Sequence, residues 1–253
     1  AIVARCLDAD LYENWTDVSG FLSADPRIVQ NPRAIGRITF DEMRELSYMG
    51  ASVLQEEAIF PVREANIPIQ IKNTNRPEDT GTVIRETADG DTNEHLITGI
   101  AGKKDFLAIH VKKAHMSNEV GVISRALNIV ERYGVSVEHI PTGVDSFGIV
   151  VNASDVKDTV YSIISDIRRE IEPDDITMVD RLALVSVVGR NMSRRSGTSG
   201  KIFGALGNAG VNIRMITQSS EEISIIVGVD NADFDRTIGV IYNGFVRDEM
   251  VSR

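Results

Sequence analysis

Between residues 107 and 179 the chain switches repeatedly between two patterns of apolar and polar positions. A short apolar run typical of a strand is followed by apolar residues at helical spacing, and Gly134 ends that helix as a C-cap would. Strand and helix patterns then recur, so the predicted order is βαββαβ. This is the ferredoxin-like plan, with two helices on one face of a four-stranded antiparallel sheet. The expected strands are residues 107–111, 135–140, 147–151 and 176–179, and the expected helices are residues 120–130 and 156–167.

The same pattern occurs a second time in the chain. An offset of 76 residues aligns residues 116–151 with residues 192–227 without a gap. Such an offset is too long for a solenoid unit and indicates a duplicated small domain. The second copy is expected at residues 182–188, 197–209, 211–217, 223–229 and 234–245, and it lacks a strong fourth strand. The identical pairs are Met116/Met192, Ser117/Ser193, Gly121/Gly197, Gly134/Gly210, Val135/Val211, Ile140/Ile216, Ile149/Ile225 and Val151/Val227.

The missing strand has a candidate in residues 95–101, a short apolar segment around Ile97 that precedes the first copy. If this segment pairs with the second copy, the first module is inserted into the second and the sheet edge is covered. The alternative is that Ile97 only ends a linker. The expected division is an N-terminal region at residues 1–85, a linker at 86–94, a first module at 104–180, and a second module formed by 95–103 and 181–253.

Residues 1–9 have a helical pattern with no capping residue ahead of it. Ile2, Val3, Cys6 and Leu7 share one face of this helix, so we expect Cys6 to be buried. A helix that starts without a cap is also expected to belong to a longer natural chain.

Composition narrows the range of partners. The formal net charge of -10 repels nucleic acid, and no apolar run approaches the roughly 20 residues that cross a membrane. A single cysteine excludes an internal disulfide and, with no secretory signal, favours the cytoplasm. The four histidines show no ligand spacing, so no metal site is expected.

Three separated motifs precede the repeat. They read WTDVSGFLSADPR at residues 15–27, FDEMRELSYMGASVL at 40–54, and PIQIKNTNRP followed by GTVI at 68–84. In order and spacing they resemble the last part of an aspartate kinase catalytic domain. GRNM at 189–192 and GVNIRMI at 210–216 resemble the second of the two ACT modules of these kinases. The resemblance therefore implies an α/β and α+β chain: the end of an amino-acid-kinase domain followed by two ACT modules, the first inserted into the second.

The resemblance implies phosphoryl transfer from Mg-ATP to the side-chain carboxylate of aspartate in the complete enzyme. The family's early Lys-Phe-Gly-Gly segment and glycine-rich loop, which hold the phosphates, do not occur here. We therefore expect no catalytic residue, no bound cofactor and no activity in this chain alone. The P-loop-like residues 197–201 lack the required spacing, and close helix packing is expected to explain Gly204, Gly207 and Gly210.

Nucleotide contact is implied for three residues that match the family. Thr16 and Asp17 match positions near the adenosine, and Arg27 matches a residue that reaches towards the phosphates. Ser52 replaces a family lysine, and Leu22 occupies a position often held by tyrosine. The alternative for Asp17, Asp25 and Arg27 is a hydrogen-bonded loop built on the Asp-Pro turn.

An amino-acid effector is expected in the first module. The loop at 114–121 leads into a helix whose free N–H groups suit a carboxylate, and Glu138 would take the ammonium group. These positions match the effector region of lysine-sensitive aspartate kinases, so lysine is preferred and threonine stays open. The alternative is that Met116, Val122 and Ile123 are core residues and Glu119 is an ordinary first-turn acid. The full expected set is Met116, Ser117, Asn118, Glu119, Gly121, Val122, Ile123, Val135 and Glu138.

The corresponding loop of the second copy contains Arg194 and Arg195, which disfavour a lysine side chain. Because ACT modules usually pair, we also expect a homodimer formed through them. The competing hypothesis is a freestanding amino-acid sensor without catalysis. Residues 1–84 distinguish the two hypotheses, because a sensor has no need of part of a kinase fold.

Overall fold

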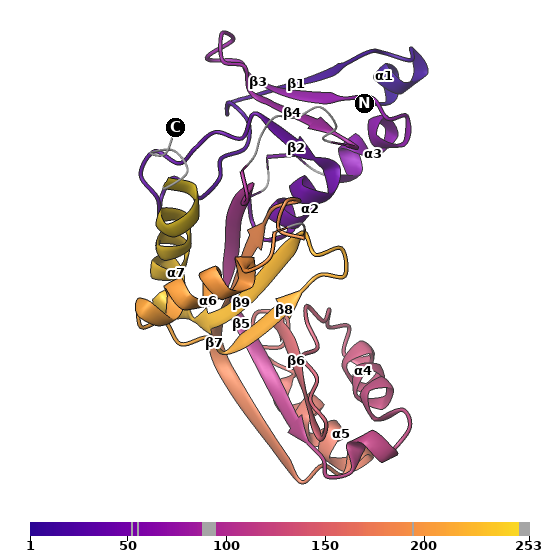
Figure 1. Ribbon diagram of the computed structural model, residues 1–253. Coiled ribbons are helices and arrows are strands. Elements are labelled where there is room, and N and C mark those ends of the chain that lie inside the picture. The colour runs from indigo at the N-terminus through magenta and orange to yellow at the C-terminus, as the bar shows by residue number, and fades with distance from the viewer. Residues whose placement is uncertain (52, 55, 88–94, 194, 248–253) are drawn as a thin grey trace.

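The computed structural model describes residues 1–51, 53–54, 56–87, 95–193 and 195–247. Figure 1 shows an N-terminal region above two β-sheet modules that share long strands. The N-terminal region has a four-stranded mixed sheet in the order β1-β3-β4-β2. Its elements are α1 (Ile2–Cys6), β1 (Tyr12–Thr16), β2 (Arg37–Thr39), α2 (Phe40–Tyr48), α3 (Glu56–Glu64), β3 (Ile69–Asn73) and β4 (Thr82–Arg85).

Helix α2 begins with a reciprocal cap that its sequence encodes. The Thr39 hydroxyl accepts from the Glu42 N–H, and the Glu42 carboxylate accepts from the Thr39 N–H at 3.0 Å. Phe40, Met43 and Leu46 lie on the buried face of the helix. This apolar face lies in one hydrophobic cluster with residues of the modules, so α2 connects the N-terminal region to them.

The two modules share one five-stranded antiparallel sheet in the order β6-β5-β7-β9-β8. Strands β5 (Gly99–Lys112) and β7 (Asp175–Val188) run through both modules, as Figure 1 shows. The far half of β5 pairs with β6 (Ser146–Asn152), whereas β9 (Ser224–Asp230) pairs with residues 182–188 of β7, and β8 (Met215–Gln218) pairs with β9. The register shifts between Lys103 and Phe106, where the first module gives way to the second.

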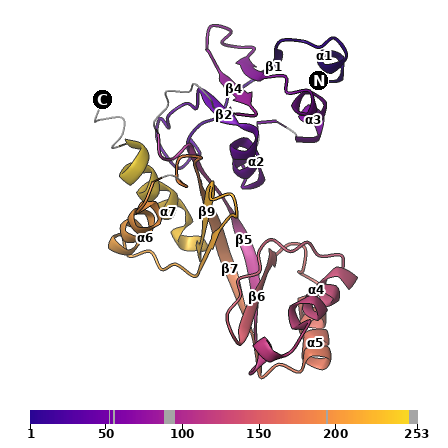
Figure 2. The same ribbon diagram turned by 45° about the vertical axis from the view of Figure 1, so that its right-hand side comes forward.

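Helices cover one face of each half of the sheet (Figure 2). In the first module α4 (Val122–Arg132) and α5 (Val160–Ile171) enclose a core with β5, β6 and β7. In the second, α6 (Thr198–Asn208) and α7 (Phe234–Ile241), which continues as a π-helix (Tyr242–Arg247), form a separate core. The mixed α/β fold expected from the sequence is therefore confirmed.

The segment around Ile97 lies against the second module. The Thr98 N–H donates to the Val188 carbonyl at 2.8 Å, and residues 99–103 pair with residues 184–188 of β7. Ile97 is buried in the core of the second module. This pairing supports the insertion of the first module into the second; the proposed linker at 86–94 falls mostly outside the described residues.

Several local expectations are wrong. Residues 135–140 form no regular strand, only a bridge between His139 and Val150, because Pro141 has no N–H to continue the ladder. The strand expected from residue 211 begins at Met215, and the helix expected from residue 156 begins at Val160.

Two expectations about packing are also wrong. Cys6 is exposed, because the helix α1 buries none of its residues. Gly204 and Gly207 have open space where a side chain would begin, so close helix packing does not explain them.

Candidate functional site

A cleft of about 860 Å³ lies between the N-terminal region and the second module. Loops after β1, after α2 and after β3 form one wall. The other wall comes from β5 and α7, through Gly102, Lys104, Phe234 and Ile238. The Lys104 ammonium lies 4.8 Å from the centre of the Phe234 ring and 3.2 Å from the Asp235 carboxylate. The cleft therefore combines an apolar wall with a cation at its rim.

Two of the three residues expected to contact a nucleotide line this cleft, namely Asp17 and Arg27. Thr16 is not part of the lining, but its hydroxyl donates to the Asp17 carboxylate at 3.2 Å. The Arg27 guanidinium binds both oxygens of Asp25, at 2.6 Å for the closer contact, and this hydrogen bond lowers the pKa of Asp25. The hydrogen-bonded loop weighed as an alternative is thus present, and the nucleotide assignment stays a prediction.

Sequence reasoning missed Arg76, Lys104 and Phe234, which also line the cleft. Lys104 comes from β5 where the two modules meet and Phe234 from the second module, both far along the chain from the loops they face. No local pattern could have placed them there.

The expected effector residues fall into two groups. Met116, Val122 and Val135 are buried in the core of the first module, and Ile123 packs against that core. Ser117, Asn118 and Glu119 are exposed around a short 3-10 turn (Met116–Asn118). Gly121 takes a left-handed φ of 82° just before α4, which a side chain would disfavour. Both the core alternative and an exposed loop at the helix start are therefore realised.

Glu119 has partners within its own module. Its carboxylate pairs with the Lys113 ammonium at 3.2 Å and with the Arg125 guanidinium. The hydrogen bond from Lys113 is the largest cause that lowers the pKa of Glu119. The extra acid is thus largely neutralised, which weakens its case as a partner for a lysine side chain.

Glu138 lies apart from the loop, at a surface hollow of about 690 Å³ between α4 and residues 134–140. Val135 lines the same hollow, whereas none of residues 116–123 does. The Tyr48 hydroxyl donates to the Glu138 carboxylate at 2.6 Å. Burial, with the hydrogen bond to Glu138 and its negative charge, raises the pKa of Tyr48 to about 12. Tyr48 therefore keeps its proton and acts as a donor at neutral pH.

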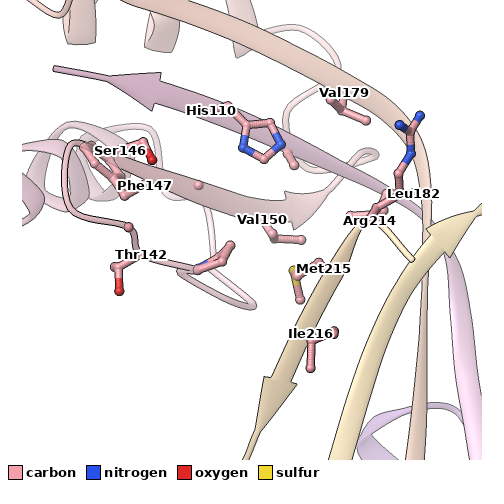
Figure 3. A pocket seen from close by; sticks show the side chains of 14 residues that line it. His110, Thr142, Ser146, Phe147, Val150, Val179, Leu182, Arg214, Met215 and Ile216 are labelled. Carbon is pink, nitrogen blue, oxygen red and sulfur yellow. The ribbon is translucent and has the colours of Figure 1, made fainter. Parts of the chain in front are cut away.

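A third pocket, of about 340 Å³, was not expected from the sequence. It lies where the open face of the first module's sheet meets β8, and Figure 3 shows His110 and Val150 on one side and Met215 and Ile216 on the other. Arg214 lies at this pocket and also pairs with Asp230 at 3.3 Å.

One fully buried carboxylate joins the N-terminal region to the second module. Glu42 accepts from the Thr98 hydroxyl at 2.6 Å, from the Arg190 N–H at 3.0 Å and from the Arg190 guanidinium at 2.8 Å. Burial alone would raise the pKa of Glu42, but these donors and the Thr39 N–H outweigh it and lower the pKa. This cluster was not anticipated, since its members lie far apart in sequence.

Two features are absent from the described residues. No group of three or more histidine, cysteine, aspartate or glutamate side chains there could hold a metal ion. No helix within those ranges has the length and apolar character needed to span a membrane.

Comparison with known proteins matches two family models to this arrangement. Residues 1–73 match the amino acid kinase family, and residues 185–245 match the ACT domain. The fold and its clefts thus define a chain with part of an amino acid kinase and a regulatory ACT portion.

Individual relatives agree with this class. Aspartokinase 3 of Bacillus subtilis is 39% identical over the whole chain, which spans 55% of that protein. The crystal structure of Clostridium acetobutylicum aspartate kinase is 50% identical with a TM-score of 0.90, covering 96% of this chain and 55% of that one. A structure of aspartokinase alpha and beta subunits is 30% identical with a TM-score of 0.53, covering 58% of this chain and 97% of that one.

The chain belongs to the aspartokinase family. It spans about half the length of the Bacillus and Clostridium relatives, at 55% of each.

Proposed function

We propose that this chain is the regulatory portion of an aspartate kinase, an enzyme that converts ATP and L-aspartate to 4-phospho-L-aspartate and ADP. In this proposal the first module binds an end-product amino acid and the N-terminal region carries the response. The observation that carries the proposal is the different use of the two equivalent loops. The loop of the second module is docked on Glu42 through Arg190, whereas Ser117 and Asn118 of the first are exposed.

Lysine is the preferred effector, and threonine is the alternative. Glu138 offers a carboxylate to an ammonium group, and the turn before α4 offers N–H groups to a carboxylate. Because none of residues 116–123 lines the hollow that contains Glu138, a single first module does not enclose both ends of an amino acid. A second copy of the chain, paired through the first modules, would supply the missing wall. Sedimentation of the protein with and without lysine would reveal such a dimer.

The test of the effector is a ligand screen by thermal unfolding with lysine, threonine and methionine, each added separately. A ligand at 100 times its dissociation constant stabilises the folded state by about 2.7 kcal/mol and raises the melting temperature. Glu138→Ala is expected to abolish the shift. Asp145→Ala, at a half-buried bend of the same module, is the control. No shift with any of the three amino acids would refute the effector site.

Mg-ATP is proposed as the substrate of the complete enzyme, with Asp17 and Arg27 contributing to its cleft. This chain alone is expected to turn over no ATP, because the family's phosphate-binding segments do not occur in it. A coupled assay with aspartate and Mg-ATP checks that expectation. Aspartate-dependent release of ADP by the purified chain would contradict it.

The second candidate function is an amino-acid sensor that acts as a separate regulatory subunit. The likeness to separate aspartokinase alpha and beta subunits is the observation that favours it. Residues 1–73 count against it, since they match the amino acid kinase family and, together with β4, form a sheet separate from that of the modules. Copurification with a separate, full-length aspartate kinase would favour this candidate.

A further inference from the structure

One side chain of the N-terminal region reaches the expected effector acid of the first module. Tyr48 is the last residue of α2, and its hydroxyl donates to Glu138 at 2.6 Å across 90 positions of the sequence. The Tyr48 ring also lies 5.1 Å from the Lys103 ammonium, which belongs to β5. Three segments therefore meet here: α2, the long shared strand, and the irregular edge of the first module.

The contact between Tyr48 and Glu138 lies close to the junction of the two modules. Lys103 stands at the register shift of β5, where the strand passes from the second module to the first. At the opposite end of α2, the buried Glu42 holds the helix to the second module. A helix of nine residues is rigid over about 13 Å. Helix α2 is thus held firmly at one end and touches the sensing module with the other.

The two contacts differ in how readily they can break. Glu42 is fully buried, so separating it from Arg190 would leave an unpaired charge in the protein interior. Tyr48 is 54% exposed, and water can replace either partner of its hydrogen bond. The Tyr48 contact is therefore the one that a small ligand could displace.

We propose that the Tyr48 hydroxyl and the ammonium group of the effector compete for the Glu138 carboxylate. A bound amino acid then frees the end of α2 from the first module and passes the signal to the N-terminal region. The inference rests on the proposed function, because it uses the same effector acid. It adds Tyr48 as the residue through which the N-terminal region senses that the effector site is occupied.

Competition has a consequence that structural damage would not have. Thermodynamic linkage requires that removing the competing hydroxyl raises the affinity for the ligand. Tyr48→Phe keeps the ring beside Lys103 and removes only the hydroxyl. It is expected to tighten lysine binding about fivefold, the ratio that corresponds to the net free energy of one hydrogen bond. A variant that merely damaged the fold would bind lysine more weakly.

The experiment is calorimetric titration of L-lysine into the wild-type chain, Tyr48→Phe and Tyr161→Phe. Tyr161 is an exposed tyrosine of α5, and its variant is the matched control, expected to have the wild-type dissociation constant. Hydrogen exchange of residues 40–48 gives a second readout. Lysine should speed exchange at the end of α2 in the wild type, and Tyr48→Phe should already exchange fast without it.

The outcomes separate the two proposals. Equal dissociation constants for the wild type and Tyr48→Phe would overturn the competition and leave the effector site standing. Weaker binding by Tyr48→Phe would also overturn it, because Tyr48 would then assist the ligand. No binding of lysine by the wild type, repeated with threonine, would overturn both the site and the competition.

Discussion

The two modules contain equivalent loops in different surroundings. Gly121 and Gly197 stand at the same place before a helix, with φ of 82° and 85°. In the first module, Glu119 pairs with Lys113 and Arg125 of its own module. In the second module, Arg190 at the start of the loop binds the buried Glu42 of the N-terminal region. The two loops have the same backbone conformation at these glycines, and their side chains decide whether a loop binds the N-terminal region.

This difference teaches how one duplicated domain can hold two roles. In the second loop Arg190 is committed to Glu42, although Ser193 and Arg195 stay exposed. The docked copy anchors the pair to the N-terminal region, and the undocked copy keeps donors at its surface. Duplication with one docked loop therefore yields a fixed module and a responsive one.

The largest expected effect comes from breaking the docked loop. Glu42→Ala leaves Arg190 without its buried partner and is expected to reduce the free energy of unfolding by about 3 kcal/mol. Urea denaturation monitored by fluorescence of Trp15, in the N-terminal region, measures the change. Glu119→Ala removes the exposed acid of the other loop and should have a far smaller effect. Comparable losses in the two variants would show that the loops are not used differently.

A smaller effect tests what the loops share. Gly121→Ala and Gly197→Ala each force a side chain into a left-handed backbone, at a cost of about 1 kcal/mol. Neither added methyl group meets a crowded neighbour, since the nearest atom is the Arg125 guanidinium nitrogen, 3.8 Å from the position at Gly121. Thermal unfolding should therefore give nearly equal losses. A marked inequality would mean that docking also constrains the backbone of the second loop.

The smallest expected effect is on the pH dependence of stability. It comes from Glu42, whose pKa lies below its ordinary value of 4.5. A carboxyl group with a depressed pKa stabilises the fold above pH 4.5 and loses that contribution as the pH falls through its folded value. Stability should thus decline on acidification below pH 4.5. Glu42→Gln should show a shallower decline than the wild type. Parallel curves for the two proteins would exclude Glu42 as a source of the acid sensitivity.

Prediction from sequence succeeded where a feature depends on nearby residues. The helix that ends before Gly134 and the strand around Ile149 follow from spacing alone, because each buries one face locally. It failed at residues 135–140, where Pro141 interrupts the pairing of an otherwise apolar segment. Among the site residues, Asp17 and Arg27 lie in one cleft, and their contact with a nucleotide stays a prediction, whereas Lys104 and Phe234 of the same cleft were not anticipated.

By itself the sequence determined the duplication, the approximate positions of most of its strands and helices, and the family motifs of the N-terminal region. These features are local, since they arise from side-chain periodicity and backbone preference over a few residues. Only the tertiary structure decided that Arg190 meets Glu42 across 148 positions and that Tyr48 meets Glu138 across 90. Such contacts depend on how α2 packs against the two modules. The physical reason is that burial and charge pairing depend on distance in the folded structure and not on separation along the chain.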